Sequence, residues 1–136
     1  MTRESWIDRY APLRGLEDPL RGAFAALPPR DVPAGAELFA PGSPCRGFAL
    51  VLEGEVRVDV VGATGRSLLL YRVGRAETCV QTTLCMLGAS SYTAQGVAER
   101  ELSVVMVPPS LFDRAMAESR IFRQFIFASF AARLDE

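Results

Sequence analysis

Apolar and polar residues alternate with a period of two along the middle of the chain, which is typical of half-buried strands. The clearest case is 55–61, where three valines alternate with two acids and an arginine. Runs of this kind, rich in β-branched residues and separated by turn residues, predict strands at 37–39, 47–53, 55–61, 67–73, 92–97 and 102–107. The last run is apolar on both faces, so we expect the terminal helices to cover it.

The two ends of the chain have helical patterns instead. Residues 6–27 predict a helix in two pieces, with Asp18 as a cap and Pro19 at the first position of the second piece. Helical character returns at 110–117 and at 119–134, where Ser119 is the expected cap. This order predicts a mainly β protein, an antiparallel double-stranded β-helix or jelly roll with flanking N-terminal helices and a long C-terminal helix.

The last predicted helix is apolar around most of its circumference. At 100° per residue its bulky apolar side chains cover roughly two thirds of the helix surface, more than one roll needs. We therefore expect a homodimer, because exposed apolar patches of this size mark interfaces. The residues predicted for this interface are Phe122, Phe125, Ile126, Phe127, Phe130 and Leu134.

Length and charge limit the range of functions. The 136 residues suffice for one domain with a real core. With 15 basic and 16 acidic residues, the net charge of −1 offers no basic surface for nucleic acid. No segment approaches the ~20 apolar residues of a membrane span, and the N-terminus has no apolar signal sequence. The expected location is therefore the cytoplasm, with no membrane partner.

Histidine is absent, and all 15 basic residues are arginine. The chain therefore cannot form the Ser-His-Asp or Cys-His arrangements of nucleophilic catalysis, and it has no imidazole ligand for a metal. We expect no enzymatic activity, no metal site and no cofactor.

The three cysteines, at positions 45, 79 and 85, have no C-x-x-C spacing. An odd number in this arrangement suits reduced thiols in a cytosol better than a disulfide framework. Two hypotheses stay open for Cys79 and Cys85, which lie six residues apart at a predicted strand-to-helix junction: core packing, or a pair of redox thiols.

The order of the elements, together with the motif F-x-L-V-L-E-G-E-V-R-V at 48–58, resembles the effector domain of the Crp/Fnr transcription regulators. The resemblance covers about residues 16–136. It is most specific between 47 and 74, at Leu50, Gly54, Val56, Val58, Gly65, Leu69 and Gly74.

This resemblance implies a single sensor domain of the cyclic-nucleotide-binding type. Residues 1–29 would be a helical lead-in, 30–108 the β-roll and 109–136 the closing helices. In the family the long helix forms a homodimer and leads into a helix-turn-helix module. We therefore expect such a DNA-binding module downstream, absent from this chain, so that DNA becomes a partner only of the longer protein.

The segment 74–98 departs from the family pattern. Nucleotide-binding members carry G-E-L-A-L and then R-x-A, in which the acid holds the ribose and the arginine pairs with the cyclic phosphate. Here Thr82 or Thr83 stands in place of the acid, and Tyr92 falls near the place of the arginine. A guanidinium that binds phosphate through two hydrogen bonds has no neutral substitute. We therefore expect no binding of cyclic AMP or cyclic GMP.

The two threonines have two interpretations. They can cap a short helix at 84–87, or they can line a remodelled pocket for an unknown small effector. The residues predicted for that pocket are Glu77, Gln81, Thr82, Thr83 and Tyr92. The resulting hypothesis is a sensor and dimerisation domain of a Crp/Fnr-like regulator, and the alternative is a cupin-like small-molecule-binding domain or enzyme on a similar roll.

Overall fold

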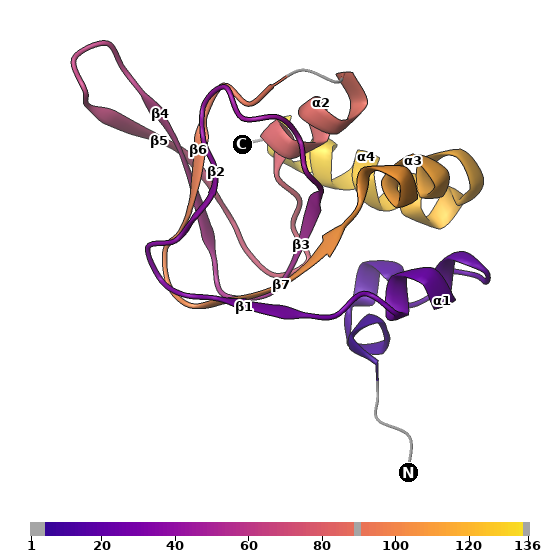
Figure 1. Ribbon diagram of the computed structural model, residues 1–136. Coiled ribbons are helices and arrows are strands. Elements are labelled where there is room, and N and C mark those ends of the chain that lie inside the picture. The colour runs from indigo at the N-terminus through magenta and orange to yellow at the C-terminus, as the bar shows by residue number, and fades with distance from the viewer. Residues whose placement is uncertain (1–4, 89–90, 135–136) are drawn as a thin grey trace.

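Two antiparallel sheets curl around a common interior to form the body of the protein (Figure 1). The computed structural model describes residues 5–88 and 91–134, without the side chains at 80, 81, 133 and 134. One sheet has the order β1-β7-β3 and the other has the order β2-β6-β4-β5. The strands are β1 Arg30–Val32, β2 Glu37–Phe39, β3 Phe48–Glu53, β4 Val56–Val61, β5 Ser67–Val73, β6 Gln95–Ala98 and β7 Leu102–Val107.

Helices gather at one side of this roll. The N-terminal segment forms η1 Trp6–Arg9, η2 Ala11–Leu13 and α1 Leu20–Ala25, while α2 Val80–Gly88 lies between β5 and β6 in the chain. After β7 come α3 Pro109–Glu118 and α4 Arg120–Leu134. Figure 1 shows α3 and α4 side by side and the β4–β5 hairpin projecting away from them. No helix in the described ranges is long and apolar enough to cross a membrane.

The strands β3 and β7 pair with each other and separate two hydrophobic cores. Leu50 and Val105 face the helices, where they join the buried aromatic residues Phe24, Phe112 and Phe122. The neighbouring positions on the two strands face the roll interior and pack with valines of β4 and β5. Because these two strands are buried on both faces, the helical layer is part of the fold and not an appendage.

The turn between β3 and β4 depends on Gly54. Its φ of +88° lies in the left-handed region, and a Cβ there would stand 2.5 Å from the carbonyl oxygen of Glu101. Any other residue at this position would be strained and would also push against the chain leading into β7. This requirement explains the glycine inside the motif at 48–58.

The sequence-based expectations for the fold are confirmed in most elements, including the jelly-roll architecture and the helical cover over β7. The amide of Phe122 donates to Ser119 Oγ (3.1 Å), so the predicted Ser119 cap forms. Helix α1 begins at Leu20 with Pro19 as its N-cap residue, so the predicted cap at Asp18 and the predicted place of Pro19 are each wrong by one residue, although the Asp18 carboxylate accepts from the Gly22 amide at 3.2 Å. Strand β1 was not predicted. It has only three residues and lies between prolines, so it carries no alternation that could reveal it.

Candidate functional site

Inside the roll, a polar contact joins α2 to the segment just before β6. Tyr92 is 6% exposed, and its Oη donates to Thr82 Oγ1 at 3.2 Å. Thr82 lies in the first turn of α2 and is itself 4% exposed. Burial raises the pKa of the Tyr92 phenol, which therefore stays a neutral donor. The two residues predicted to replace the family's arginine and acid thus bind each other.

Phe39 covers the other side of Tyr92. The two rings are stacked, with centroids 4.1 Å apart and planes inclined by 10°. Phe39 in turn lies opposite Gly96 in the β2–β6 pairing, and a Cβ at Gly96 would overlap the Phe39 ring. Gly96 therefore leaves the room that lets this aromatic pair lie inside the roll.

The space left inside the roll is small and uncharged. The cavity beside Tyr92 measures about 40 Å³, room for a few water molecules at most. Among the described side chains, those of Cys79, Thr82 and Tyr92 are the polar ones that line it. A wider open groove of about 260 Å³ lies on the outer side of Phe39 and Tyr92, with Glu37 and Arg46 among its lining residues.

The other residues predicted for the pocket lie elsewhere or have local roles. Glu77 is exposed, and its carboxylate accepts from the Gly74 amide at 2.7 Å, so it closes a turn outside the cavity. Thr83 Oγ1 donates to the Cys79 carbonyl oxygen at 3.0 Å. The side chain of Gln81 lies outside the described residues. Of the four predicted residues whose side chains the structure describes, Thr82 and Tyr92 come together.

The predicted capping role of the threonines is wrong. Helix α2 begins at Val80, two residues before Thr82, so both threonines lie inside its first turn. The Thr83 amide donates to the Cys79 carbonyl at 2.9 Å, which is an ordinary helical bond. Their hydroxyls are therefore free to make the side-chain bonds described above.

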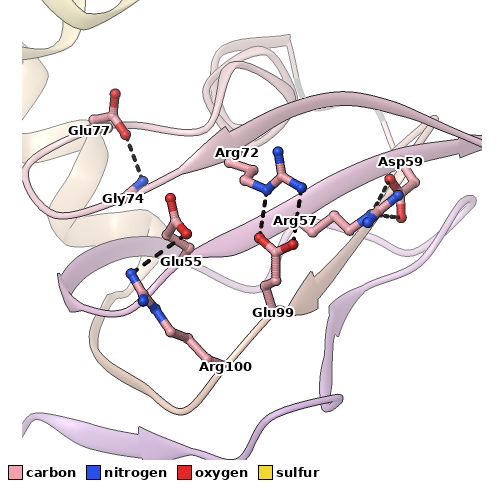
Figure 2. A network of polar contacts seen from close by, with 8 residues as sticks. All are labelled: Glu55, Arg57, Asp59, Arg72, Gly74, Glu77, Glu99 and Arg100. Atoms are coloured by element: carbon pink, nitrogen blue, oxygen red, sulfur yellow. Dashed lines mark hydrogen bonds and ion pairs between the residues drawn. The ribbon is translucent and has the colours of Figure 1, made fainter.

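Arg72 and Arg100 form ion pairs on the surface of the roll (Figure 2). Arg72 donates to both carboxylate oxygens of Glu99, at 2.6 and 3.1 Å, and these bonds hold the pKa of Glu99 below its ordinary value. Arg100 lies 3.6 Å from the carboxylate of Glu55. Arg75 donates to the carbonyl of Arg9 at 3.1 Å. None of these guanidinium groups lines the cavity beside Tyr92.

Two of the cysteines form a disulfide, which corrects the prediction of three reduced thiols. Cys45 bonds to Cys85, with their Cα atoms 6.0 Å apart. Cys79 is a buried free cysteine whose Sγ lies 3.6 Å from Tyr71 Oη. The sequence pointed to Cys79 and Cys85 because they are close in the chain. The fold instead brings Cys85 to a loop 40 residues earlier.

The predicted dimer interface also needs correction. Phe122, Phe125 and Ile126 are 0%, 7% and 1% exposed, so they belong to the protein's own core. The N-terminal helices as well as the roll cover α4, and together they bury a wider arc than one sheet would. Phe127 remains 57% exposed and Phe130 is half-buried, while the Leu134 side chain lies outside the described residues.

No cluster within residues 5–88 and 91–134 is suited to a metal ion. A group of three or more His, Cys, Asp or Glu side chains does not occur in that part of the chain.

The model of the cyclic nucleotide-binding domain family matches residues 29–119, which is more than half of the chain. The chain belongs to this family. Similarity to curated proteins was not detected. Solved structures that share 16–20% of their sequence with this cyclic nucleotide-binding domain have the same fold.

Three solved structures are similar to this domain. A protein assigned to the Crp/Fnr regulators of Eubacterium rectale has a TM-score of 0.77 at 20% identity, covering 90% of this chain and 57% of the other. The catabolite activator protein of Thermus thermophilus has a TM-score of 0.73 at 20% identity, covering 91% and 58%. The sensor domain of the regulator DNR from Pseudomonas aeruginosa has a TM-score of 0.73 at 16% identity, covering 95% and 86%.

The lengths of these structures differ in a consistent way. This domain spans 57% and 58% of the first two chains but 86% of the isolated sensor domain. The expected resemblance to the Crp/Fnr effector domain is therefore confirmed at the level of fold.

Sequence reasoning missed Phe39, the residue that completes the closed pocket. A strand was correctly expected at 37–39, but the ring's partner Tyr92 lies far along the chain. The available signal was Gly96, because a glycine inside a strand often marks the close approach of another group.

Proposed function

We propose that this chain is the sensor and dimerisation domain of a Crp/Fnr-like transcription regulator that does not respond to cyclic nucleotides. One observation carries the proposal. Tyr92 is stacked on Phe39 and hydrogen-bonded to Thr82, and it occupies space inside the roll of a domain that belongs to the cyclic nucleotide-binding family.

Volume supports this proposal. Ligand sites that enclose a molecule of drug or nucleotide size measure about 300–1,000 Å³, whereas the interior cavity here measures about 40 Å³. A nucleotide could enter only if Tyr92 and Phe39 both moved out, which would separate Tyr92 from Thr82 and break the ring stack.

Charge supports it as well. A cyclic phosphate needs a cation, and none of the described residues that line the interior cavity is an arginine, while the guanidinium groups of Arg72 and Arg100 pair with Glu99 and Glu55 outside it. Loss of two charge-assisted hydrogen bonds of about 1.5–3 kcal/mol each weakens binding by roughly 10² to 10⁴. An effector that entered the roll interior would have to be small, neutral and mostly apolar.

The proposed dimer uses the exposed part of α4. Phe127 and Phe130 lie there, and α2 adds two further exposed apolar side chains, Leu84 (48%) and Leu87 (52%). A second copy of the chain that covered these residues would remove the largest exposed aromatic ring of α4 from water.

The proposed regulator would reach DNA through a further segment of a longer protein, and this role places it in the cytoplasm. The shares of 57% and 58% that the domain covers in two regulator-like structures support this arrangement. No specific observation in the described residues favours the cupin-like alternative.

Thermal unfolding with and without nucleotide tests the proposal. A site with a Kd of about 10 µM would add about 2.7 kcal/mol of stability at ~1 mM ligand, which raises the Tm of a domain of this size by several degrees. We expect no change in Tm with cyclic AMP or cyclic GMP. An upward shift of several degrees with either nucleotide would contradict the closed pocket.

A further inference from the structure

The disulfide between Cys45 and Cys85 ties together two segments that meet at the mouth of the roll. Cys45 lies in the loop between β2 and β3, and Cys85 lies on α2. The same loop holds the backbone of Tyr92, since the Gly42 amide donates to the Tyr92 carbonyl at 2.8 Å and the Tyr92 amide donates to the Ser43 carbonyl at 3.1 Å. The loop, Tyr92 and α2 therefore form one connected unit.

Helix α2 links this unit to the rest of the molecule. It contacts both β3 and α4, and Met86, the residue after Cys85, packs against the core between the helices and the sheet. Helix α2 therefore contacts α4 directly, and α4 carries the exposed Phe127.

The disulfide can be reached from solvent. It lines an open groove of about 520 Å³, whose walls include Pro44, Met86 and Pro109. Cys45 is half-buried, while Cys85 is only 2% exposed. A small thiol that entered the groove would therefore meet the sulfur of Cys45 first.

We propose that the Cys45–Cys85 disulfide is a reversible redox site that sets how firmly α2 is held. The proposal rests on the cytoplasmic role proposed above, because disulfides in that compartment are usually transient and redox-sensing. In the oxidised form α2 is fixed to the loop and to Tyr92. In the reduced form α2 keeps its packing and the Thr82–Tyr92 hydrogen bond but loses its covalent tie.

The chemistry needs a dithiol as reductant. Its thiolate attacks Sγ of Cys45, forms a mixed disulfide and releases Cys85 as a thiolate that takes up a proton. The second thiolate of the reductant then attacks the reductant sulfur that is bonded to Cys45. This step releases Cys45 as a thiolate, which also takes up a proton. Two electrons pass to the protein, and the reductant leaves as its disulfide.

The test counts thiols and follows amide hydrogen exchange on the whole chain. Protein purified in air is incubated with or without dithiothreitol under native conditions, then unfolded, alkylated and weighed. We expect one alkylated cysteine before reduction and three after it, because Cys79 is the free cysteine. Glutathione disulfide should restore the count of one after the dithiothreitol is removed.

Exchange measurements separate a switch from a purely structural crosslink. Reduction should speed amide exchange in α2 by ~10-fold or more and measurably in α4, while the strand β4 stays protected. Cys45→Ser should exchange like the reduced protein and no longer respond to dithiothreitol. The matched control Cys79→Ser should respond as the wild type does.

Three results would overturn the proposal: three free thiols in air-purified protein, reduction that occurs only after denaturant is added, or unchanged exchange in α2 after complete reduction. The wild-type measurements decide the matter even if Cys45→Ser does not fold. None of these readouts involves a nucleotide, DNA or the dimer. The redox proposal can therefore fail while the proposed function stands, and the proposed function can fail while the redox proposal stands.

Discussion

Tyr92 connects three parts of the roll through its side chain and its backbone. Its hydroxyl reaches Thr82 on α2, its ring lies on Phe39 of β2, and its backbone is bonded to the loop at Gly42 and Ser43. A residue with this many partners is costly to displace, and each contact can be tested separately because the ring and the hydroxyl act on different neighbours.

A double-mutant cycle between Tyr92→Phe and Thr82→Val measures the buried hydrogen bond. Each single variant should lower the free energy of unfolding by about 1 kcal/mol, since it leaves the other partner unsatisfied while the ring stack remains. The double variant should cost less than the sum, with a coupling of about 1 kcal/mol in urea denaturation. Strict additivity would show that the bond does not contribute.

Tyr10 gives the opposite prediction. Its hydroxyl is buried and has no hydrogen-bond partner among the described residues, and burial raises the pKa of the phenol. Tyr10→Phe should therefore be neutral or stabilising by up to about 1 kcal/mol at pH 7.

The pH dependence of this variant follows from the same shift. In the unfolded chain the phenol ionises near its ordinary pKa of about 10, while in the folded chain it stays protonated to higher pH. The free energy of unfolding of the wild type is therefore unaffected by this ionisation below pH ~10. Above that pH it falls by about 1.4 kcal/mol per pH unit, because the unfolded chain loses the phenol proton and the folded chain does not. Urea midpoints of the two proteins between pH 8 and 11 should diverge in favour of Tyr10→Phe, and parallel curves would contradict this.

Local patterns predicted individual residues only where the partner was also local. The Ser119 cap follows from its neighbours in sequence and forms, while Asp18 lies one residue outside the N-cap of α1 and still accepts from the nearby Gly22 amide. The stack of Phe39 on Tyr92 joins positions that are distant in the chain, and so does the Cys45–Cys85 bond. No periodicity in the sequence records such pairs.

At the scale of elements, the long alternating strands were predicted almost to the residue. β4 and β5 match in their bounds, but the alternation predicted for β4 breaks at a bulge between Val58 and Asp59, where Asp59 is 5% exposed and its carboxylate accepts from Arg57. The predicted start of α2 was too late, because the helix begins at Val80, before the two threonines. The apolar arc of α4 was assigned to a partner subunit, because the sequence does not show that the N-terminal helices pack against it.

Reduction of the disulfide should lower the free energy of unfolding by about 4 kcal/mol, since in the chain-entropy model closing a loop of this length removes that much freedom from the unfolded chain. Urea unfolding with and without dithiothreitol measures the difference. Cys79→Ser, which leaves the disulfide intact, is the control and should show the same dithiothreitol-dependent loss. Equal stabilities in the two redox states would mean that the bond does not constrain the unfolded chain.

At the scale of the whole molecule, the predicted homodimer depends on the exposed part of α4. Phe127→Arg should raise the Kd of the dimer by ~10-fold or more, because it places a charge in the centre of the proposed interface. Ala26→Arg, at an exposed position at the end of α1, is the matched control and should leave the dimer unchanged. Sedimentation that finds only a 14.8 kDa species for the wild type at micromolar concentration would contradict the dimer.

In the proposed function, the side chains of Tyr92 and Phe39 occupy the space in which a member of this family would hold a nucleotide. Calorimetric titration of the chain with cyclic AMP and with cyclic GMP tests this most directly. The closed cavity beside Tyr92 and the pairing of Arg72 and Arg100 on the surface predict no saturable heat up to about 1 mM nucleotide. A saturable isotherm for either nucleotide with a Kd at or below about 10 µM would contradict the account.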